Sequence, residues 1–577
     1  MSLRRAVACL LALLLAGCST TVPSTGPVEK VAPAGQGRVE RGVRVQPAPP
    51  QEDVAPDVVL AGFLDAMASL EPGFGVARQY LTPKAARSWD PHAGVIVYDG
   101  DTRSSLPGST TAGLQARVVG TLDAQGHYTA STGRLIRQNF TMQQVDGQWR
   151  ISNPPSGLLV SQYTLLNRFT PAQVWFQGLD AHTLVPERVW LASSPASPLE
   201  AVQALLDGPS RWLEVSVTTA FPPGTRLTVD AVTVTGGVAE VPLDGRIAAL
   251  PDAQRSQLVS QVGTTLKAFP DIRAVRILCD GQPWHAPGQT ASGEVPLDAL
   301  PGMPSIPLEG DEQPFAVVGN AVGRLDDQGA FSPLGGRLGR NQWGDRPGEL
   351  AVSTTAGVVA LVNHGRTRLV TSRLGQDEVS PRLTGTGLAS PVVTATGVVW
   401  AVVDADGEVA LRRASGTQNL APVRVPSLKG SRILQVAVAP DQTRMAVVLR
   451  RGGRSELALL RIHGGVVDGL RRIPLEVSQL SLEEVVDAAW TGPEQLMVLA
   501  AQHPGARPSA FLISADASQV DPVGPAGELD LVQVTARAQQ RGAPVLLRAS
   551  SGEVLRHVSA WRWHILPHRV RSLAVPS

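Results

Sequence analysis

The residues with the clearest potential for metal chemistry lie close to the C-terminus, in the stretch WRWHILPH at residues 561–568. His564 and His568 are four residues apart, a spacing that brings two imidazoles together on a helix as metal ligands. Pro567 and the two alternating tryptophans instead indicate a β-strand, in which residues four apart share a face but stand well separated. No acidic residue or third histidine lies nearby in the sequence. We therefore expect no metal here, and interpret the stretch as a closing strand whose tryptophans cover the core or a protein-binding rim.

A second short motif partly imitates a calcium-binding loop. Asp404, Asp406 and Gly407 have the spacing of the first ligands and the glycine of such a loop, but no acidic residue stands where the bidentate carboxylate belongs. Apolar runs typical of strands flank the motif, whereas an EF-hand needs a helix on each side. We predict a hairpin turn.

The sequence patterns of common catalytic sites are missing. There is no G-x-S-x-G elbow, no H-E-x-x-H, no phosphate-binding loop and no C-x-x-C pair. Four histidines, His92, His127, His182 and His285, lie near predicted turns without a serine or cysteine nucleophile close in sequence. Because function has to be argued from a site, we expect a protein that is not an enzyme and needs no cofactor.

The chain contains only three cysteines, at positions 9, 18 and 279. Cys9 lies in the apolar leader, so removal of the leader leaves two cysteines and no disulfide framework. Cys279 ends the run VRILC, where a small strand hydrophobe is the expected role. The chemistry of Cys18 is therefore the part that needs explanation.

Cys18 directly follows Leu15, Ala16 and Gly17, and before them come two arginines and a short apolar run. This arrangement resembles the lipobox of bacterial lipoproteins, which implies a signal peptide at residues 1–17, an S-diacylglyceryl group on Cys18 and, as a further modification, N-palmitoylation. Two acyl chains, at about 0.8 kcal/mol per buried CH₂, anchor a protein stably. The resemblance thus predicts a lipid anchor on the extracytoplasmic face of the cell membrane. The alternative is an ordinary secretory signal that happens to contain a cysteine.

The composition sets limits on the rest of the chain. At 577 residues it is too long for one hydrophobic core, so several domains are expected. The net charge of +1 gives no basic excess of the kind that binds nucleic acid. The 57 glycines and 46 prolines indicate many turns and a β-rich protein.

The first folded unit is expected at residues 56–162, after a lipidated tether at residues 18–55 that is rich in Ser, Thr, Pro and Gly. Leu60, Phe63, Met67 and Leu70 recur at helical intervals, a second short helix is predicted over residues 77–89, and strand-like runs follow. Helices followed by an antiparallel sheet indicate an α+β domain. The ending VDGQWRISNPP resembles the closing strands of NTF2-like domains.

The next unit, residues 163–298, carries a clear helix start in which Ser197 caps the helix, Pro198 stands at its first position and Glu200 completes a capping box. Strands, a second helix and a final strand follow. The segments LEAVQALLDGPS, FPPGTRLTVDAVTV, GGVAEVPLDG and IRAVRILCDGQPW resemble the GerM domain of sporulation and germination proteins. The resemblance implies an α/β, non-catalytic module that assembles or binds at cell envelopes.

After a linker at residues 299–312, apolar strand cores recur over residues 313–577. Six cores begin 42, 40, 47, 51 and 49 residues apart, at residues 316, 358, 398, 445, 496 and 545. A repeat of this length with several strands is the signature of a β-propeller. Within it, VAVAPDQTRMAVV resembles the blades of bacterial envelope propellers, with Asp441 capping a turn. We predict six blades or, if one is hidden in residues 501–545, seven; a stacked β-sandwich is the alternative.

The combination of lipobox, tether, NTF2-like unit, GerM-like unit and propeller resembles the LpqB family of actinobacterial lipoproteins over essentially the whole chain. The stretch FLDAMASLEPGFGVARQYLTPKAARSWDP, residues 63–91, is similar to that family's N-terminal signature. The resemblance implies an accessory protein of the MtrAB two-component system that binds the sensor domain of the histidine kinase MtrB and affects envelope homeostasis and division. It identifies no partner-binding residue beyond the anchor, and it leaves the oligomeric state open.

Two other functions remain open on the sequence. A protein that binds cell-wall glycan or peptidoglycan without a kinase partner requires exposed aromatic residues around the propeller channel, for which Trp343, Trp400 and Trp490 are candidates. Each of these tryptophans could equally be a core residue. An envelope hydrolase requires paired carboxylates or a nucleophile that meet in one pocket.

Overall fold

The computed structural model of the chain describes residues 47–105, 109–179, 183–192, 197–301, 313–405, 408–477, 480–525, 529–538, 544–559 and 561–576. Within this range, residues from Pro47 onward group as one compact unit. The predicted signal peptide, Cys18 and its motif, most of the tether, most of the 299–312 linker and His182 lie outside the described residues. No helix in the described part has the length and apolar character needed to cross a bilayer.

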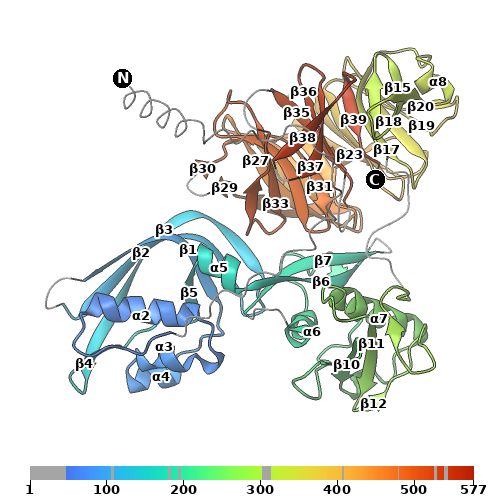
Figure 1. Cartoon of the computed structure of the whole chain (residues 1–577). Helices are drawn as coiled ribbons and strands as arrows, with labels where there is room; N and C mark the ends of the chain where they lie inside the picture. The colour runs from blue at the N-terminus through green and yellow to red at the C-terminus, as the bar shows by residue number, and fades with distance from the viewer. Residues whose placement is uncertain are drawn as a thin grey trace, which may run out of the picture. The chain divides into compact units, whose positions relative to one another are not determined.

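The N-terminal domain is an α+β unit in which helices pack on a five-stranded sheet (Figure 1). Helix α2 (Pro56–Ala68) buries Leu60, Phe63 and Met67 completely, as its apolar periodicity predicts. The sheet has the order β4-β3-β2-β1-β5, and β5 is parallel to β1 while the other pairs are antiparallel. Its strands are β1 (Val95–Ser105), β2 (Thr111–Leu122), β3 (Tyr128–Val145), β4 (Gln148–Ile151) and β5 (Leu158–Ser161). The NTF2-like assignment stays a prediction.

The predicted helix over residues 77–89 is divided into α3 (Gly75–Gln79) and α4 (Pro83–Ser88). Pro83 is the first residue of α4, and the Thr82 side chain accepts a hydrogen bond from Ala85 N at 3.3 Å. Proline lacks the backbone N–H that would donate to a carbonyl of the preceding helical turn. Pro83 therefore begins a new helix instead of continuing α3.

The middle unit contains two small sheets and two helices. Helix α6 (Pro198–Asp207) begins with the predicted capping box between Ser197 and Glu200, and α7 (Asp252–Leu266) connects two parallel strands. One sheet has the order β7-β6-β8, with β6 (Thr170–Gly178), β7 (Leu184–Leu191) and β8 (Val217–Thr218). The other contains β9 (Thr233–Thr235), β10 (Val238–Leu243), β11 (Ala274–Cys279), β12 (Gln282–Pro283) and β13 (Val295–Pro296). Helix α5 (Gln162–Arg168) precedes this unit.

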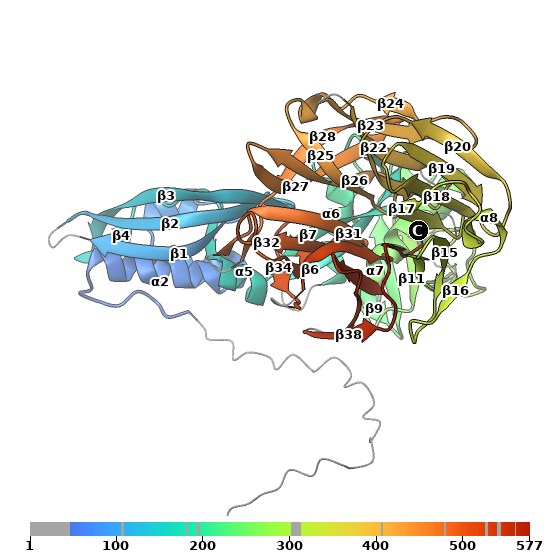
Figure 2. The same cartoon turned by 90° about the horizontal axis from the view of Figure 1, so that it is seen from above.

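Among the described residues the C-terminal part forms six four-stranded antiparallel sheets that follow one another around an axis (Figure 2). From the axis outward, blade 1 consists of β39 (Ser572–Ala574), β14 (Phe315–Val318), β15 (Ala321–Leu325) and β16 (Phe331–Pro333). Blade 2 consists of β17 (Pro347–Ser353), β18 (Val358–Asn363), β19 (Arg368–Arg373) and β20 (Val379–Thr384). Blade 3 consists of β21 (Leu388–Val393), β22 (Val399–Ala405), β23 (Glu408–Ala414) and β24 (Ala421–Val423).

Blades 4 to 6 repeat this plan. Blade 4 consists of β25 (Arg432–Val438), β26 (Arg444–Arg451), β27 (Arg454–His463) and β28 (Val466–Ile473). Blade 5 consists of β31 (Glu484–Gly492), β32 (Gln495–Ala501), β33 (Ser509–Ser514) and β34 (Val520–Pro522). Blade 6 consists of β35 (Leu531–Ala536), β36 (Val545–Ala549), β37 (Val554–Ser559) and β38 (Arg562–Leu566). Residues 501–545, where a seventh blade was conceivable, supply β33, β34 and β35 to blades 5 and 6.

The ring closes through the C-terminal strand. β39 pairs with β14, so Phe315 lies opposite Ala574, and the first blade is built from both ends of the propeller segment. The six inner strands contact one another in an unbroken cycle, β39-β17-β21-β25-β31-β35 and back to β39. A stacked sandwich would not produce this cycle, so the propeller prediction is confirmed.

The middle unit also contacts blade 4. The Trp212 indole N–H donates to Gly469 O at 2.6 Å, and the guanidinium carbon of Arg471 lies 4.3 Å from the Trp212 ring centroid. Arg461 donates to Trp212 O at 2.6 Å. A stacked arginine and two hydrogen bonds thus connect two segments that are about 250 residues apart in the sequence.

Candidate functional site: the axial channel of the propeller

A cavity of about 560 Å³ runs along the propeller axis, and all six blades contribute residues to its wall. This volume lies within the range of small-molecule binding sites, roughly 300–1,000 Å³. The wall is formed mainly by the inner strands, whose outer edges pair within the blade and whose inner edges face the channel. Such an open edge exposes backbone N–H and C=O groups that need partners.

Five of the six inner strands carry a β-bulge or register irregularity in their N-terminal half. It falls between Pro347 and Leu350, Ala389 and Val392, Ile433 and Gln435, Val485 and Asp487, and Leu531 and Gln533. A bulge redirects a side chain and interrupts the strand ladder. Each of these positions brings a polar residue to the channel: Glu349, Ser390, Gln435, Asp487 and Gln533, with Ser572 at the start of the sixth strand.

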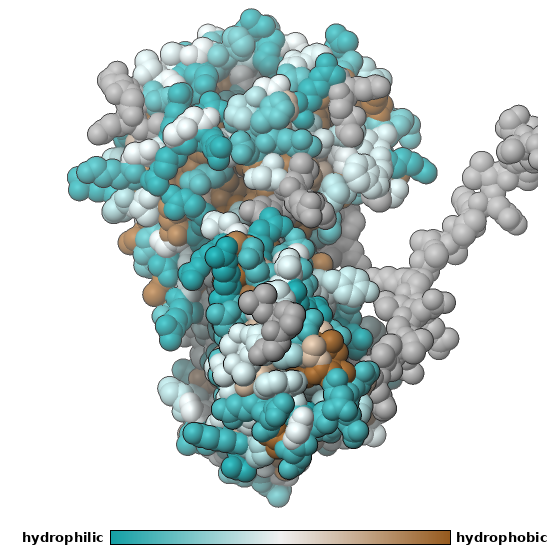
Figure 3. All heavy atoms as spheres, turned by 90° about the vertical axis from the view of Figure 1, so that its left-hand side faces the viewer, coloured by the Kyte–Doolittle hydropathy of each residue, from teal (hydrophilic) through white to brown (hydrophobic). Residues whose placement is uncertain are grey.

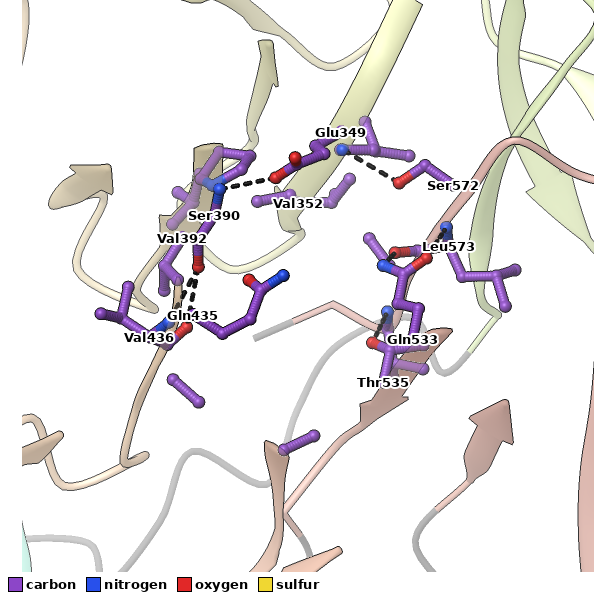
Figure 4. A pocket seen from close by; sticks show the side chains of 18 of the residues that line it. Glu349, Val352, Ser390, Val392, Gln435, Val436, Gln533, Thr535, Ser572 and Leu573 are labelled. Atoms are coloured by element: carbon purple, nitrogen blue, oxygen red, sulfur yellow. Dashed lines mark hydrogen bonds between the residues drawn. The ribbon is translucent and has the colours of Figure 1, made fainter. Parts of the chain in front are cut away.

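Most of these polar side chains hold the backbone of the next blade (Figure 4). The backbone N–H of Leu350 donates to Ser572 Oγ at 3.1 Å, that of Ser390 to Glu349 Oε2 at 2.5 Å, and that of Val436 to Ser390 Oγ at 2.9 Å. In the same way Val534 N–H donates to Asp487 Oδ2 at 2.9 Å, and Leu573 N–H donates to Gln533 Oε1 at 3.2 Å. These side chains thus form a ring of hydrogen bonds that joins neighbouring blades everywhere except between blades 4 and 5, where Gln435 makes no such bond within the described residues.

Two carboxyl groups in this ring have shifted ionisation. Burial raises the pKa of Asp487 to about 7, against the effect of the Val534 and Ala488 N–H groups, and the nearby charge of Glu349 adds to the rise. Burial also raises the pKa of Glu349, opposed by the Ser390 N–H and by Arg366 and Arg548. No ion pair within 4 Å engages either carboxyl group in the described residues. Both carboxyl groups are therefore largely desolvated and lack a direct ion-pair partner, although the more distant charge of Arg548 favours the ionised form of both.

A separate group of charges holds blades 4 and 5 together outside the channel. Arg444 is almost completely buried, and its guanidinium donates to Asp441 Oδ2 at 2.6 Å, to Pro493 O at 2.8 Å and to Glu494. Asp441 also caps the turn before β26 as predicted, because its Oδ1 accepts from Thr443 N at 2.8 Å. Every charge is hydrogen-bonded, so this cluster is structural and exposes no reactive group.

Three family models together cover most of the chain. "Lipoprotein LpqB, N-terminal domain" matches residues 49–166, "Sporulation and spore germination" matches residues 173–284, and "Lipoprotein LpqB beta-propeller domain" matches residues 321–577. A relative named Lipoprotein LpqB from Cutibacterium acnes is 33% identical over 99% of both chains. The chain belongs to the LpqB lipoprotein family.

Other members of the LpqB family align over much of their length. The protein from Thermobifida fusca is 28% identical and the match covers 88% of both chains, while that from Streptomyces coelicolor is 27% identical over 96% of this chain and 94% of its own. Solved structures resemble parts of the chain only distantly. TolB from Acinetobacter baumannii has a TM-score of 0.34 at 14% identity, covering 47% of this chain and 68% of its own. The tandem GerMN domains of GerM from Bacillus subtilis reach 0.19 at 16% identity, covering 24% and 48%. These two scores are too low to support an argument.

The residues considered for metal binding in this LpqB-family chain are placed as strand and turn residues. His564 lies in β38 opposite Arg556, and His568 follows the strand end. Asp404 lies in β22 and pairs with Arg432, whereas Asp406 and Gly407 fall outside the described residues. No group of three or more metal-ligating side chains occurs in the part of the chain that the structure describes.

The candidate glycan-binding tryptophans are not available as an exposed platform. Trp343, Trp400 and Trp490 are only 5%, 2% and 4% exposed. Trp490 reaches the channel wall, but its indole N–H donates to Ala437 O at 2.9 Å. Of the two roles left open by the sequence, the core role holds for these three residues, because each fills space between blades instead of standing on the rim.

Near the C-terminus the two tryptophans that flank His564 differ. The Trp563 indole N–H donates to Val523 O at 3.0 Å, and its ring lies tilted with its centroid 4.8 Å from that of His557. Trp563 therefore covers the core between blades 5 and 6. Trp561 is 60% exposed and lies on the surface.

One histidine that the sequence left unassigned lies in a charged cluster. His127 is almost buried, its Nδ1 lies 3.1 Å from Asp123 Oδ2, and its Nε2 lies 3.6 Å from Glu187 Oε2. Burial opposes its charge, but the hydrogen bond that its Nδ1–H donates to Asp123 and the charges of Glu187, Asp123 and Asp207 together raise the pKa of His127. Only the fold brings Glu187 and Asp207 close to His127, because both are at least 60 residues away in the sequence.

Proposed function

We propose that this protein is a membrane-anchored lipoprotein that works outside the cytoplasm as an accessory regulator of a two-component system. In this proposal Cys18 carries the diacylglyceryl anchor, and the folded domains bind the sensor domain of an MtrB-like histidine kinase. The observation that carries the proposal is the match to the LpqB family along 99% of the chain, together with the Leu15-Ala16-Gly17-Cys18 motif at its start.

The surface of the folded part is consistent with attachment through acyl chains. The face drawn in Figure 3 is mainly hydrophilic, and its hydrophobic areas are small and separate. Large exposed hydrophobic side chains such as Leu135, Tyr163 and Val466 come from different elements of the structure. Two acyl chains on one cysteine supply the membrane affinity that such a surface lacks.

The mechanism that we propose for these modules is binding. A regulator that binds one conformation of the kinase more tightly than the other shifts the balance between them by the difference in binding free energy, and by no more. Anchoring both proteins in one membrane raises their effective concentration, so a modest affinity is sufficient.

The test is a binding experiment followed by a functional one. Residues 47–577 should bind the isolated extracytoplasmic domain of the organism's MtrB-like kinase, and should not bind that of an unrelated sensor kinase. In vesicles that contain the full-length kinase, the lipidated protein should change the rate of autophosphorylation. Failure of both the binding and the rate change would refute the regulatory role.

The anchor is tested separately with Cys18→Ser. We expect this variant to be released from the membrane or to accumulate as an unprocessed precursor, while its soluble domains still bind the kinase domain. Mass spectrometry of the wild-type protein should find an acylated peptide that begins at Cys18. Unchanged membrane retention of the variant would contradict lipid anchoring without affecting the binding test.

A further inference from the structure

One polar residue of the channel ring is left without a role in joining the blades. Gln435 occupies the bulged position of blade 4, equivalent to those of Glu349, Asp487 and Gln533, yet its carboxamide makes no hydrogen bond within the described residues. Figure 4 shows this carboxamide pointing into the cavity, away from the neighbouring strands. A side chain that offers both a donor and an acceptor to an enclosed space is suited to a ligand.

Guanidinium groups gather at the same end of the channel. Arg366, Arg548 and Arg571 all line the cavity. Arg366 Nε–H donates to Leu388 O at 2.9 Å and Arg548 Nε–H to Gln533 Oε1 at 3.0 Å, so backbone and amide groups hold both side chains in place. The terminal nitrogens of Arg366 make no hydrogen bond to the described residues. Arg366 and Arg548 both act on the ionisation of Glu349, which places these three groups close together.

The formal charge of this end of the channel is positive, because three guanidinium groups stand against two carboxyl groups. Burial disfavours the ionised form of both carboxyl groups, and it also lowers the pKa of Arg548 and of Arg571. A planar guanidinium forms short, charge-assisted hydrogen bonds with a carboxylate, often in pairs. An anionic group that enters here therefore meets prepared donors without having to displace an existing ion pair.

The other end of the channel is mainly apolar, although Thr394, Gln442 and Arg537 also line the cavity there. All six inner strands run in the same direction along the axis, so their C-terminal halves meet at the end opposite the ring of polar residues. The cavity wall there includes Val352, Val438, Trp490, Ala536 and Val575. A ligand that fits both ends carries an acidic group at one end and an uncharged body at the other.

We propose that the axial channel binds a small ligand with a terminal carboxylate, which pairs with Arg366 and Arg548 and accepts a hydrogen bond from Gln435, while its uncharged body extends toward the apolar end. The chemistry fits the C-terminus of a short extended peptide and also a free aliphatic carboxylic acid. The proposal does not depend on the kinase partner, because every residue it uses lies in the propeller.

The experiment uses the full chain purified in detergent and three probes. These are a mixture of N-acetylated tetrapeptides with free carboxyl ends, the same mixture with amidated ends, and pentanoate. Ligand-observed NMR reports which probes bind, and isothermal titration calorimetry with the best peptide gives its dissociation constant. Arg366→Gln and Gln435→Leu test the site, and Arg368→Gln serves as the control because Arg368 is an exposed arginine on the next strand that does not line the cavity.

We expect free-carboxyl probes to bind and amidated peptides to bind at least about tenfold more weakly, the loss typical of a charged hydrogen bond. Arg366→Gln and Gln435→Leu should weaken binding, Arg368→Gln should not, and all three variants should melt like the wild type. Binding of pentanoate alone would identify a free acid as the source, and binding of the peptides alone would identify a chain end; both results support the carboxylate chemistry. Equal binding of amidated peptides, binding unaffected by both channel variants, or binding of no probe would overturn the proposal.

Discussion

Arg444→Met provides the most direct test of how the propeller blades are held together. The guanidinium of Arg444 lies between Asp441 in the turn before β26 and Glu494 in the turn before β32, and all three residues are less than 5% exposed. Methionine keeps most of the side-chain volume and removes the charge. The variant therefore leaves two buried carboxylates without a cation, which costs about 3–5 kcal/mol of folding free energy.

The size of the effect can be measured as a shift in melting temperature. A domain of the propeller's size loses about 2 °C per kcal/mol, so Arg444→Met should lower the melting temperature of the propeller by roughly 6–10 °C in differential scanning calorimetry of residues 47–577. Arg454→Met is a matched control, because Arg454 pairs with Glu483 at 3.4 Å but its side chain is 70% exposed. An exposed pair contributes about 0–1 kcal/mol, so this variant should melt within about 2 °C of the wild type.

The pH dependence supplies an internal check. Burial raises the pKa of Glu494 and the charge of Arg444 opposes that rise, so the pKa should rise further in the variant. A carboxyl group whose folded pKa lies above its unfolded value destabilises the protein at high pH and less so as the pH falls. The deficit of Arg444→Met should therefore shrink between pH 8 and pH 5. Equal melting temperatures for Arg444→Met and Arg454→Met at pH 8, or a deficit that stays constant between pH 8 and pH 5, would refute the reasoning.

Three further predictions concern other parts of the molecule. Burial raises the pKa of Asp487 to about 7, so ionisation of this carboxyl group destabilises the propeller. The melting temperature of the wild type should therefore fall relative to that of Asp487→Asn as the pH is raised from 5 to 8. Parallel curves of melting temperature against pH would contradict this. Protonated His127 is stabilised by Asp123, and this stabilisation is complete below about pH 6.5, the pKa of histidine in the unfolded chain. It is lost as the pH rises through the raised pKa of the folded protein. His127→Gln should therefore lower the melting temperature more at pH 6 than at pH 9. Trp212→Ala removes the contact with the Arg471 guanidinium and the hydrogen bond to Gly469 O, so it should lower the free energy of unfolding by about 1–3 kcal/mol. It should also increase proteolysis near residue 212 under native conditions. An unchanged cleavage pattern would argue against this contact.

The regular part of the propeller could be predicted because its second strands are apolar on both faces. The six strand cores found by their spacing are β14, β18, β22, β26, β32 and β36, the second strand of each blade. In β26 the first six residues are buried, and in β32 the last six are. Such strands lie between two neighbours and read as continuous hydrophobic runs, which recur once per blade. The period therefore marks the middle of each blade.

The channel could not be predicted in the same way. Its polar residues are one per blade, 39 or more positions apart, and of different types, as in Glu349, Ser390 and Asp487. Each follows or lies within a bulge, which shifts the alternation of inward and outward residues by one and hides the pattern. The one available signal is an isolated polar residue in an apolar run, such as Gln435 in RILQVAV, and only the closed ring shows that these residues meet.

Closure also explains why the channel and the stability of the propeller depend on the same residues. Each inner strand has one free edge, and a propeller without the β39–β14 pairing would expose that edge to water. Side chains at the bulged positions satisfy part of this edge by bonding the next blade, which fixes their orientation and leaves a cavity of defined shape between them. Among the described residues of the channel wall, the Gln435 carboxamide and the terminal nitrogens of Arg366 take no part in blade closure. They can therefore contact a ligand without breaking a hydrogen bond that holds the ring together. A binding site at this position thus lowers the stability of the propeller little.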